Sequence, residues 1–182
     1  MIKNSSLLAF ICLISFQACK QNVTQTATKW SEDIKTKIIE DASLQPDKTE
    51  YDSIKHELHL YKNNKKLKYY YFTPVTDSTE KIIRYDTAFV IFYSADQDFQ
   101  LVRKPCITGA ERSEETVAYK GNAFGLVKFT YCSRPITETG FRYNNLNVGI
   151  WTKYDSEGKV TSETDNGNKD ILKKLEEMKY YR

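Results

Sequence analysis

The sequence predicts an α+β fold, in which a mostly antiparallel β-sheet of hairpins is flanked by an N-terminal and a C-terminal helix. Thirteen Tyr and nine Phe stand against seven Gly and four Pro, and aromatic side chains suit the half-buried surface of a pleated sheet. Near both ends of the chain, apolar residues recur at helical spacing. With 40% hydrophobic and 28% charged residues, the composition is typical of a globular domain.

The first element is a helix, predicted to begin at Ser31 and to end before Pro46. Ser31 is its expected N-cap, and Glu32 and Asp33 in the first turn favour a helix N-terminus at this point. Pro46 ends the segment, because proline cannot continue a helix. The apolar residues that define its buried side are Trp30, Ile34, Ile38, Ile39 and Ala42.

Hairpins are predicted to follow this helix. Two aromatic and β-rich runs between residues 51 and 72 flank Asn63 and Asn64, which are typical of a tight hairpin turn. Residues 88–93 are continuously apolar and predict a central strand that ends in a polar turn at 94–98. The remaining predicted elements are strands at 99–102, 126–132 and 139–154 and a C-terminal helix capped by Asn168.

The first nineteen residues combine a basic start, an apolar run over 7–16 and the tripeptide Gln17-Ala18-Cys19. These are the parts of a secretory signal peptide, and the apolar run is too short to span a bilayer. The segment resembles a bacterial lipoprotein signal of the Bacteroidota type, which implies that residues 1–18 are removed and that Cys19 is acylated. An ordinary signal peptide with an incidental Cys is the alternative.

This resemblance sets the expected organisation and location of the protein. Residues 19–28 would form the lipidated Cys and a flexible tether, and residues 29–182 would form a single α+β domain. Several acyl chains would anchor the protein stably, as an outer-membrane lipoprotein facing the periplasm or, alternatively, at the cell surface. A net charge of +3 from 27 basic and 24 acidic residues is too balanced to predict binding to nucleic acid.

Two cysteines of an exported protein that lie outside its leader most simply form a disulfide. Here they are Cys106 and Cys132, since Cys12 lies in the signal peptide and Cys19 would carry lipid. A bridge that closes a loop of about 26 residues stabilises the fold by about 3 kcal/mol. A Cys nucleophile is the alternative, but it needs a nearby base, and both histidines lie in a different segment.

Residues 138–167 contain a Gly, an aromatic strand, an Asn-rich turn and then the pattern Gly-x-Trp-x-x-Tyr-Asp-x-x-Gly-Lys. The residues of this pattern are Gly149, Trp151, Tyr154, Asp155, Gly158 and Lys159. The stretch resembles a MORN-variant repeat, which occurs in proteins described as YwqK-like antitoxin components. Over about 30 residues, the resemblance implies hairpins at the end of a mixed sheet and a binding role of the immunity or antitoxin type.

The sequence offers few candidates for catalysis or metal binding. His56 and His59 are interpreted as surface residues, because strand residues three apart point to opposite faces and cannot share one ion. Glu114 and Glu115 are interpreted as solvated carboxylates with ordinary pKa values. The mature sequence carries no Gly-rich phosphate loop and no nucleophile elbow, so neither a catalytic residue nor a cofactor nor a metal is expected.

The leading hypothesis is therefore a lipid-anchored binding protein of the cell envelope, which holds a protein partner through aromatic side chains on its sheet. The alternatives are an envelope hydrolase or processing factor with an unrecognised site, and a purely structural lipoprotein. The same aromatic residues could instead fill the core beneath the helices. The candidate binding residues are Tyr69, Tyr71, Tyr143, Trp151 and Tyr154.

Overall fold

The computed structural model describes residue 29 and residues 31–107, 109–134, 137–168 and 170. The predicted signal peptide, the lipidated Cys19 and the tether lie outside these residues. The apolar side of the predicted C-terminal helix, residues 171–178, also lies outside them. The structure therefore bears on the body of the domain, and it does not test the signal peptide, the acylation of Cys19 or the tether.

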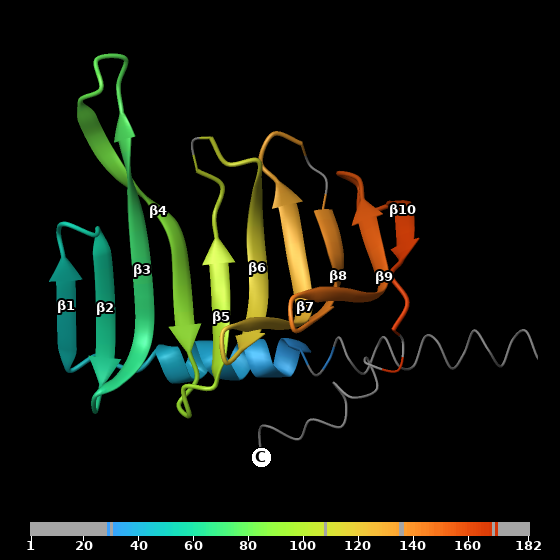
Figure 1. Cartoon of the computed structure of the whole chain (residues 1–182), viewed down its shortest axis with the longest axis horizontal. Helices are drawn as coiled ribbons and strands as arrows, with labels where there is room; N and C mark the ends of the chain where they lie inside the picture. The colour runs from blue at the N-terminus through green and yellow to red at the C-terminus, as the bar shows by residue number, and fades with distance from the viewer. Residues whose placement is uncertain (1–28, 30, 108, 135–136, 169, 171–182) are drawn as a thin grey trace, which may run out of the picture.

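One antiparallel sheet of ten strands makes up most of the described chain, and its strands lie side by side in the order of the sequence (Figure 1). Each strand pairs only with its neighbours along the chain. The strands are β1 (Lys48–Asp52), β2 (Glu57–Lys62), β3 (Lys65–Thr76), β4 (Ile82–Tyr93), β5 (Phe99–Lys104), β6 (Arg112–Tyr119), β7 (Asn122–Tyr131), β8 (Thr137–Tyr143), β9 (Leu146–Tyr154) and β10 (Val160–Asp165).

The predicted α+β fold with two flanking helices is wrong. In the described residues, the sheet continues from Lys48 to Asp165, and a single short helix, over residues 31–42 with Lys29 also helical, accompanies it. The prediction counted too few strands because β6 begins with charged residues and shows no apolar run. Its Glu114 and Glu115 are placed opposite Lys104 and Arg103 of β5, and opposite charges stabilise such cross-strand pairs.

The predicted Asn turns are confirmed. Asn63 and Asn64 connect β2 to β3 with φ of 51° and 62°, and Asn144 and Asn145 connect β8 to β9 with φ of 49° and 67°. Two consecutive residues with positive φ match the twist of a tight hairpin, and Asn tolerates this conformation better than most residues. The hairpins predicted for residues 138–167 are present as β8, β9 and β10.

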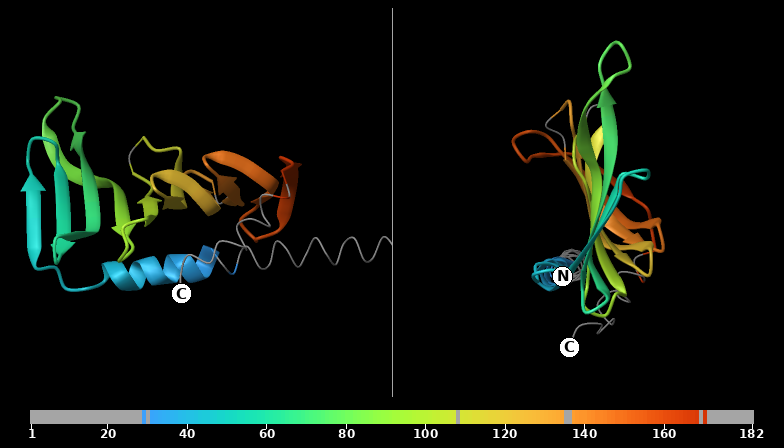
Figure 2. Two further views of the ribbon diagram at one scale, coloured as in Figure 1. Left: turned by 60° about the horizontal axis from the view of Figure 1, so that its bottom comes forward. Right: turned by 90° about the vertical axis from the view of Figure 1, so that its left-hand side faces the viewer.

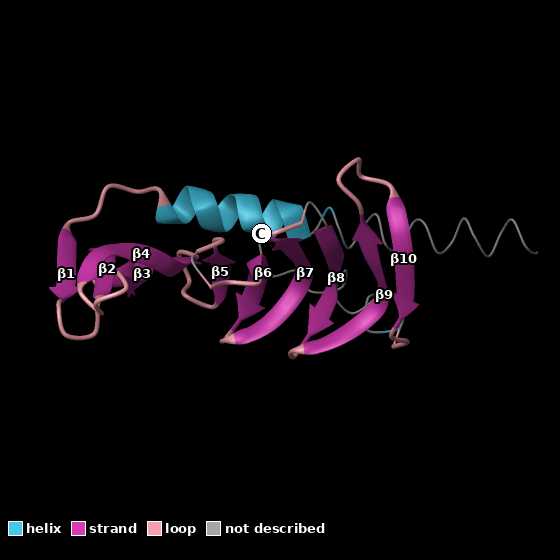
Figure 3. Cartoon of the chain, turned by 90° about the horizontal axis from the view of Figure 1, so that it is seen from above, coloured by secondary structure: helices cyan, strands magenta, loops and turns pink. Residues whose placement is uncertain are grey.

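The helix lies across one face of the sheet, at the level of β4 to β7 (Figures 2 and 3). Its Ile34 and Ile38 are buried against residues of β5 and β6, and Phe92 of β4 packs at the margin of this cluster. The strand residues of the cluster are Phe99, Leu101 and Val117. Hydrophobic burial on this side, which we call the helix face, therefore holds the helix to the middle of the sheet.

Ser31 does not cap the helix as predicted. It lies within the helical residues and is 2% exposed, and its Oγ accepts a hydrogen bond of 3.1 Å from the backbone N–H of Leu126 in β7. The ladder between β6 and β7 shifts register between Thr116 and Ala118, and such a shift leaves backbone groups without a strand partner. Ser31 thus satisfies a strand N–H and fixes the helix to the sheet.

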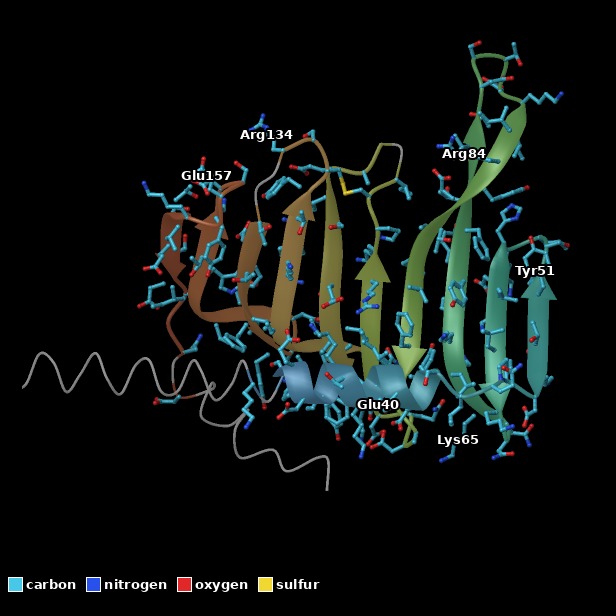
Figure 4. The ribbon with its side chains drawn as sticks, turned by 180° about the vertical axis from the view of Figure 1, so that it is seen from behind. Glu40, Tyr51, Lys65, Arg84, Arg134 and Glu157 are labelled. Carbon is cyan, nitrogen blue, oxygen red and sulfur yellow. A yellow bond between two sulfur atoms is a disulfide. The ribbon has the colours of Figure 1, made fainter. Side chains whose placement is uncertain are left out.

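The predicted disulfide is confirmed. Cys106 and Cys132 are bonded, with Cα atoms 5.6 Å apart. The bridge joins the loop after β5 to the loop after β7, at the end of the sheet away from the helix (Figure 4). It therefore adds a covalent bond between two connections that the backbone hydrogen bond from Cys132 N–H to Glu111 O also joins.

The β3–β4 hairpin projects beyond its neighbours as an arm, which we define as residues 72–87 (Figure 1). The pairing of β2 with β3 ends at Tyr71, and the pairing of β4 with β5 begins at Val90. The turn before β2 supports the base of the arm, because the His56 ring packs at 4.8 Å from the Tyr85 ring. Figure 4 labels Arg84 on the arm and Tyr51 on β1, toward the same edge of the sheet.

Candidate functional site

The structure separates the five predicted binding residues. Tyr69 and Tyr71 lie together on β3, whereas Tyr143, Trp151 and Tyr154 lie at the other end of the sheet on β8 and β9. Trp151 is 4% exposed and packs against Phe129, so it belongs to the core. Only the two residues of β3 therefore form part of one accessible site.

Strand alternation shows which face each residue occupies. Leu101 packs against the helix and pairs with Phe92, which in turn pairs with Lys68. Successive residues point to opposite faces, so Tyr69 and Tyr71 point away from the helix. We call this second side of the sheet the open face.

Tyr143 lies on the helix face, where its ring contacts Phe124 at 5.2 Å and continues a row of rings that leads to Phe99. Tyr154 is directly opposite Thr137, and Thr137 is directly opposite Thr130 of β7. Lys128 is two residues from Thr130, so Tyr154 points to the same side of the sheet as Lys128. Both side chains are half-buried. The prediction that they join Tyr69 and Tyr71 in one binding surface therefore does not match their positions in the sheet.

The open face of β2 to β4 carries a continuous group of aromatic rings, which we call the aromatic patch. The His59 ring stacks on Tyr69 at 4.7 Å, Tyr69 meets Phe89 edge-on at 5.6 Å, and Tyr71 stacks on Phe89 at 5.3 Å. All of these side chains are half-buried, and none is fully covered. The members of the patch are Glu57, His59, Tyr61, Tyr69, Tyr71 and Phe89.

Glu57 is the carboxylate within the aromatic patch. Its Oε1 accepts a 3.0 Å hydrogen bond from the Tyr69 hydroxyl, and its Oε2 lies 3.4 Å from Nε2 of His59. Burial and the hydrogen bond to the Glu57 carboxylate raise the pKa of Tyr69 to about 12. The tyrosine is thus a neutral donor at ordinary pH, and it holds the carboxylate against the rings.

The two histidines are not the ordinary surface residues that the sequence suggests. His56 occupies the turn before β2 with φ of 58°, and His59 lies in β2 between aromatic rings. The Nδ1 atoms of both are buried without a hydrogen-bond partner. Among the described residues, no group of three or more His, Cys, Asp or Glu side chains could hold a metal ion.

The helix face has a hollow of its own, with a volume of about 400 Å³, over β4 to β7. Glu115 in this hollow accepts hydrogen bonds of 2.7 Å from Arg103 and 3.1 Å from Lys35 of the helix. Burial raises the pKa of Glu115, but the hydrogen bonds and positive charges of Arg103 and Lys35 together outweigh it, so the pKa lies below its ordinary value. This carboxylate is therefore ionised, and its negative charge is already balanced by Arg103 and Lys35.

Glu114 behaves in the same way on the other side of β6. Burial raises its pKa, but hydrogen bonds from Thr116 and Lys104, together with the positive charges of Lys104 and Arg142, outweigh that effect and lower the pKa. The interpretation of Glu114 and Glu115 as solvated carboxylates with ordinary pKa values is wrong, since both are half-buried and paired. Because adjacent strand residues point to opposite faces, these two carboxylates do not converge on a common site.

Sequence reasoning missed Glu57, His59, Tyr61 and Phe89 as parts of the site. A signal was present, since residues 57–61 alternate between polar or aromatic residues and leucines. That alternation places Glu57, His59 and Tyr61 on one face of β2. Their proximity to Tyr69 depends on the register of β2 against β3, which places His59 directly opposite Tyr69.

No family model, curated protein or solved structure matches this chain. The case for a function therefore depends on the residues described above. Within the part of the chain that the structure describes, no helix is long and apolar enough to cross a membrane.

Proposed function

We propose that this protein is a lipid-anchored binding protein of the cell envelope, and that it holds a protein partner on the aromatic patch. Cys19 would carry the anchor, on the outer membrane facing the periplasm. A partner of the toxin class would make it an immunity protein, as the resemblance of residues 138–167 to MORN-variant repeats implies. The patch is the part of this proposal that the described residues support.

The supporting observation is a set of aromatic side chains that stays accessible on the open face. The rings of Tyr69 and Tyr71 each contact the ring of Phe89, while the helix lies on the opposite side of the sheet (Figure 3). Aromatic residues with a polar handle are enriched where proteins bind one another, because each combines a large contact area with few rotatable bonds.

Two adjacent residues of β3 provide a matched test of the patch. Tyr71 belongs to the patch, whereas Tyr70 points to the helix face and stacks on Phe72 at 6.2 Å. The mature protein is used to capture partners from the native host, and each candidate is then purified and its Kd measured against Tyr71→Ala and Tyr70→Ala. We expect Tyr71→Ala to weaken the complex by about tenfold or more, and Tyr70→Ala to leave it within about twofold. Equal effects of the two variants would argue against the patch.

The anchor is tested separately. Metabolic labelling with a fatty acid is compared between the wild type and Cys19→Ala in the native host. Label that disappears in Cys19→Ala supports acylation at this residue. Label that is absent from both proteins would contradict the lipoprotein part of the proposal and leave an exported domain without a lipid.

A further inference from the structure

The charges on the open face of β1 to β4 leave one carboxylate without a Lys or Arg partner. Lys48 lies 2.6 Å from Glu50, Lys55 lies 3.9 Å from Asp52, and Arg84 lies 2.9 Å from Asp86. Pairing across the strands places Glu50 opposite His59 and Asp52 opposite Glu57, so these groups share one surface. Among the described residues, Glu57 has no Lys or Arg within salt-bridge distance.

Glu57 keeps the capacity to bind a cation from outside. An ionised carboxylate accepts up to about four hydrogen bonds, and Glu57 receives one from Tyr69, with Nε2 of His59 3.4 Å from its other oxygen. Its side chain is 24% exposed, and that of His59 is 20% exposed. The carboxylate is thus held in place, partly desolvated and still reachable from solvent.

The rings around Glu57 suit a planar cation. The His59 and Tyr69 rings are stacked with an angle of 18° between their planes, and the Tyr71 and Phe89 rings are stacked at 26°. The face of an aromatic ring attracts a cation. The same surface already shows this contact, since Nζ of Lys48 lies 5.4 Å from the centre of the Tyr61 ring.

We propose that the aromatic patch is the docking site for an arginine side chain of the partner, whose guanidinium pairs with Glu57 and stacks on the neighbouring rings. This inference rests on the proposed function and names the chemistry of the partner. Guanidinium fits better than ammonium, because it is planar, stacks on aromatic rings and donates two parallel hydrogen bonds to one carboxylate. The partner therefore presents a basic segment to β2 and β3.

The test uses the mature protein and a capped tri-arginine peptide as the probe, with tri-citrulline and tri-lysine peptides of the same length beside it. Binding is followed by NMR chemical shifts, which also report whether each variant is folded. Glu57→Gln removes the charge but keeps an oxygen for the Tyr69 hydroxyl. Glu50→Gln is the matched control, because it removes an equal charge from the same face, where Glu50 is paired with Lys48.

We expect the tri-arginine peptide to shift the resonances of β2 and β3 and to bind Glu57→Gln about tenfold more weakly than the wild type. Glu50→Gln should retain the affinity of the wild type within about threefold. The citrulline peptide, which has the shape of arginine without its charge, should not bind. These results together would support the inference.

Three outcomes would overturn it. Equal weakening by Glu57→Gln and Glu50→Gln would indicate general charge attraction, and equal binding of tri-lysine and tri-arginine would remove the preference for guanidinium. A dimer of the protein alone that dissociates on Glu57→Gln would make a second copy of this chain the occupant. A purified partner that loses affinity with Tyr71→Ala but not with Glu57→Gln would overturn the arginine contact while the proposed binding function stands.

Discussion

Glu115 combines burial, two cationic partners and a lowered pKa in one side chain. A carboxyl group whose pKa is lower in the folded protein stabilises the fold above its unfolded pKa, and that stabilisation is lost as the pH falls through the folded pKa. At neutral pH, Glu115→Gln should therefore lower the free energy of unfolding by about 1 kcal/mol. The difference from wild type should shrink as the pH falls below 4.5, the ordinary value for Glu.

Urea unfolding at a series of pH values measures this difference. Glu157→Gln is the control, because Glu157 is exposed in the turn before β10 (Figure 4) and should have little effect at any pH. A Glu115→Gln effect that is independent of pH in the acid range would show that the loss arises from packing and not from the charge.

Gly140 shows why one position of the predicted MORN-like stretch requires glycine. A Cβ atom added to Gly140 would overlap the indole ring of Trp151, whose Nε1 donates a 3.2 Å hydrogen bond to the Phe141 carbonyl. We expect Gly140→Ala to lower the free energy of unfolding by about 1–3 kcal/mol and to shift Trp fluorescence to the red. Thr139→Ala, at the next residue on the opposite face, is the control; a loss as large there would contradict the close contact as the cause.

At the scale of elements, the polar contacts of Ser31, Lys35 and Asp41 hold the helix in addition to its apolar side. Ser31→Ala would leave the Leu126 N–H without its acceptor, and a buried unsatisfied donor costs about 1–3 kcal/mol. Thr36→Ala is a matched control on the same helix, because the Thr36 hydroxyl donates only to Glu32 O, one turn earlier, in an exposed position. Thermal unfolding of both variants measures the difference. Ala favours a helix more than Ser or Thr does, so equal losses would contradict the hydrogen bond to Leu126 as the cause.

The elements that the sequence predicted well are those set by local chemistry. The Asn63-Asn64 and Asn144-Asn145 turns, the strand at 88–93 and the disulfide all follow from nearby residues or from simple counting. β6 was missed because its carboxylates gain their charged partners from other elements, namely from β5 across the strand pair and from Lys35 of the helix. Two of the six members of the aromatic patch were predicted, because Tyr69 and Tyr71 lie two residues apart on one strand. The register that brings His59 and Phe89 to them depends on pairing between strands.

For the molecule as a whole, burial is concentrated in the middle of the sheet. Phe99, Leu101 and Val127 are fully buried, whereas every residue of β10 is exposed and β1 is nearly so. Regions with few buried contacts open at lower free energy. We therefore expect backbone amides of β5 to β7 to exchange with solvent most slowly and those of β1 and β10 to exchange fastest, as measured by hydrogen exchange. Uniform protection across all ten strands would contradict this gradient.

The strictly sequential strand order has a consequence for how the protein reaches its folded state. Because each strand pairs with the one before it, most contacts join residues that are close in the chain, and such topologies fold faster than sheets with distant pairings. A chain that emerges from a pore N-terminus first can add each strand to the edge left by the previous one. The same order allows a hairpin to be gained or lost at either end without changing the register of the others, as in repeat proteins whose units contact only their neighbours.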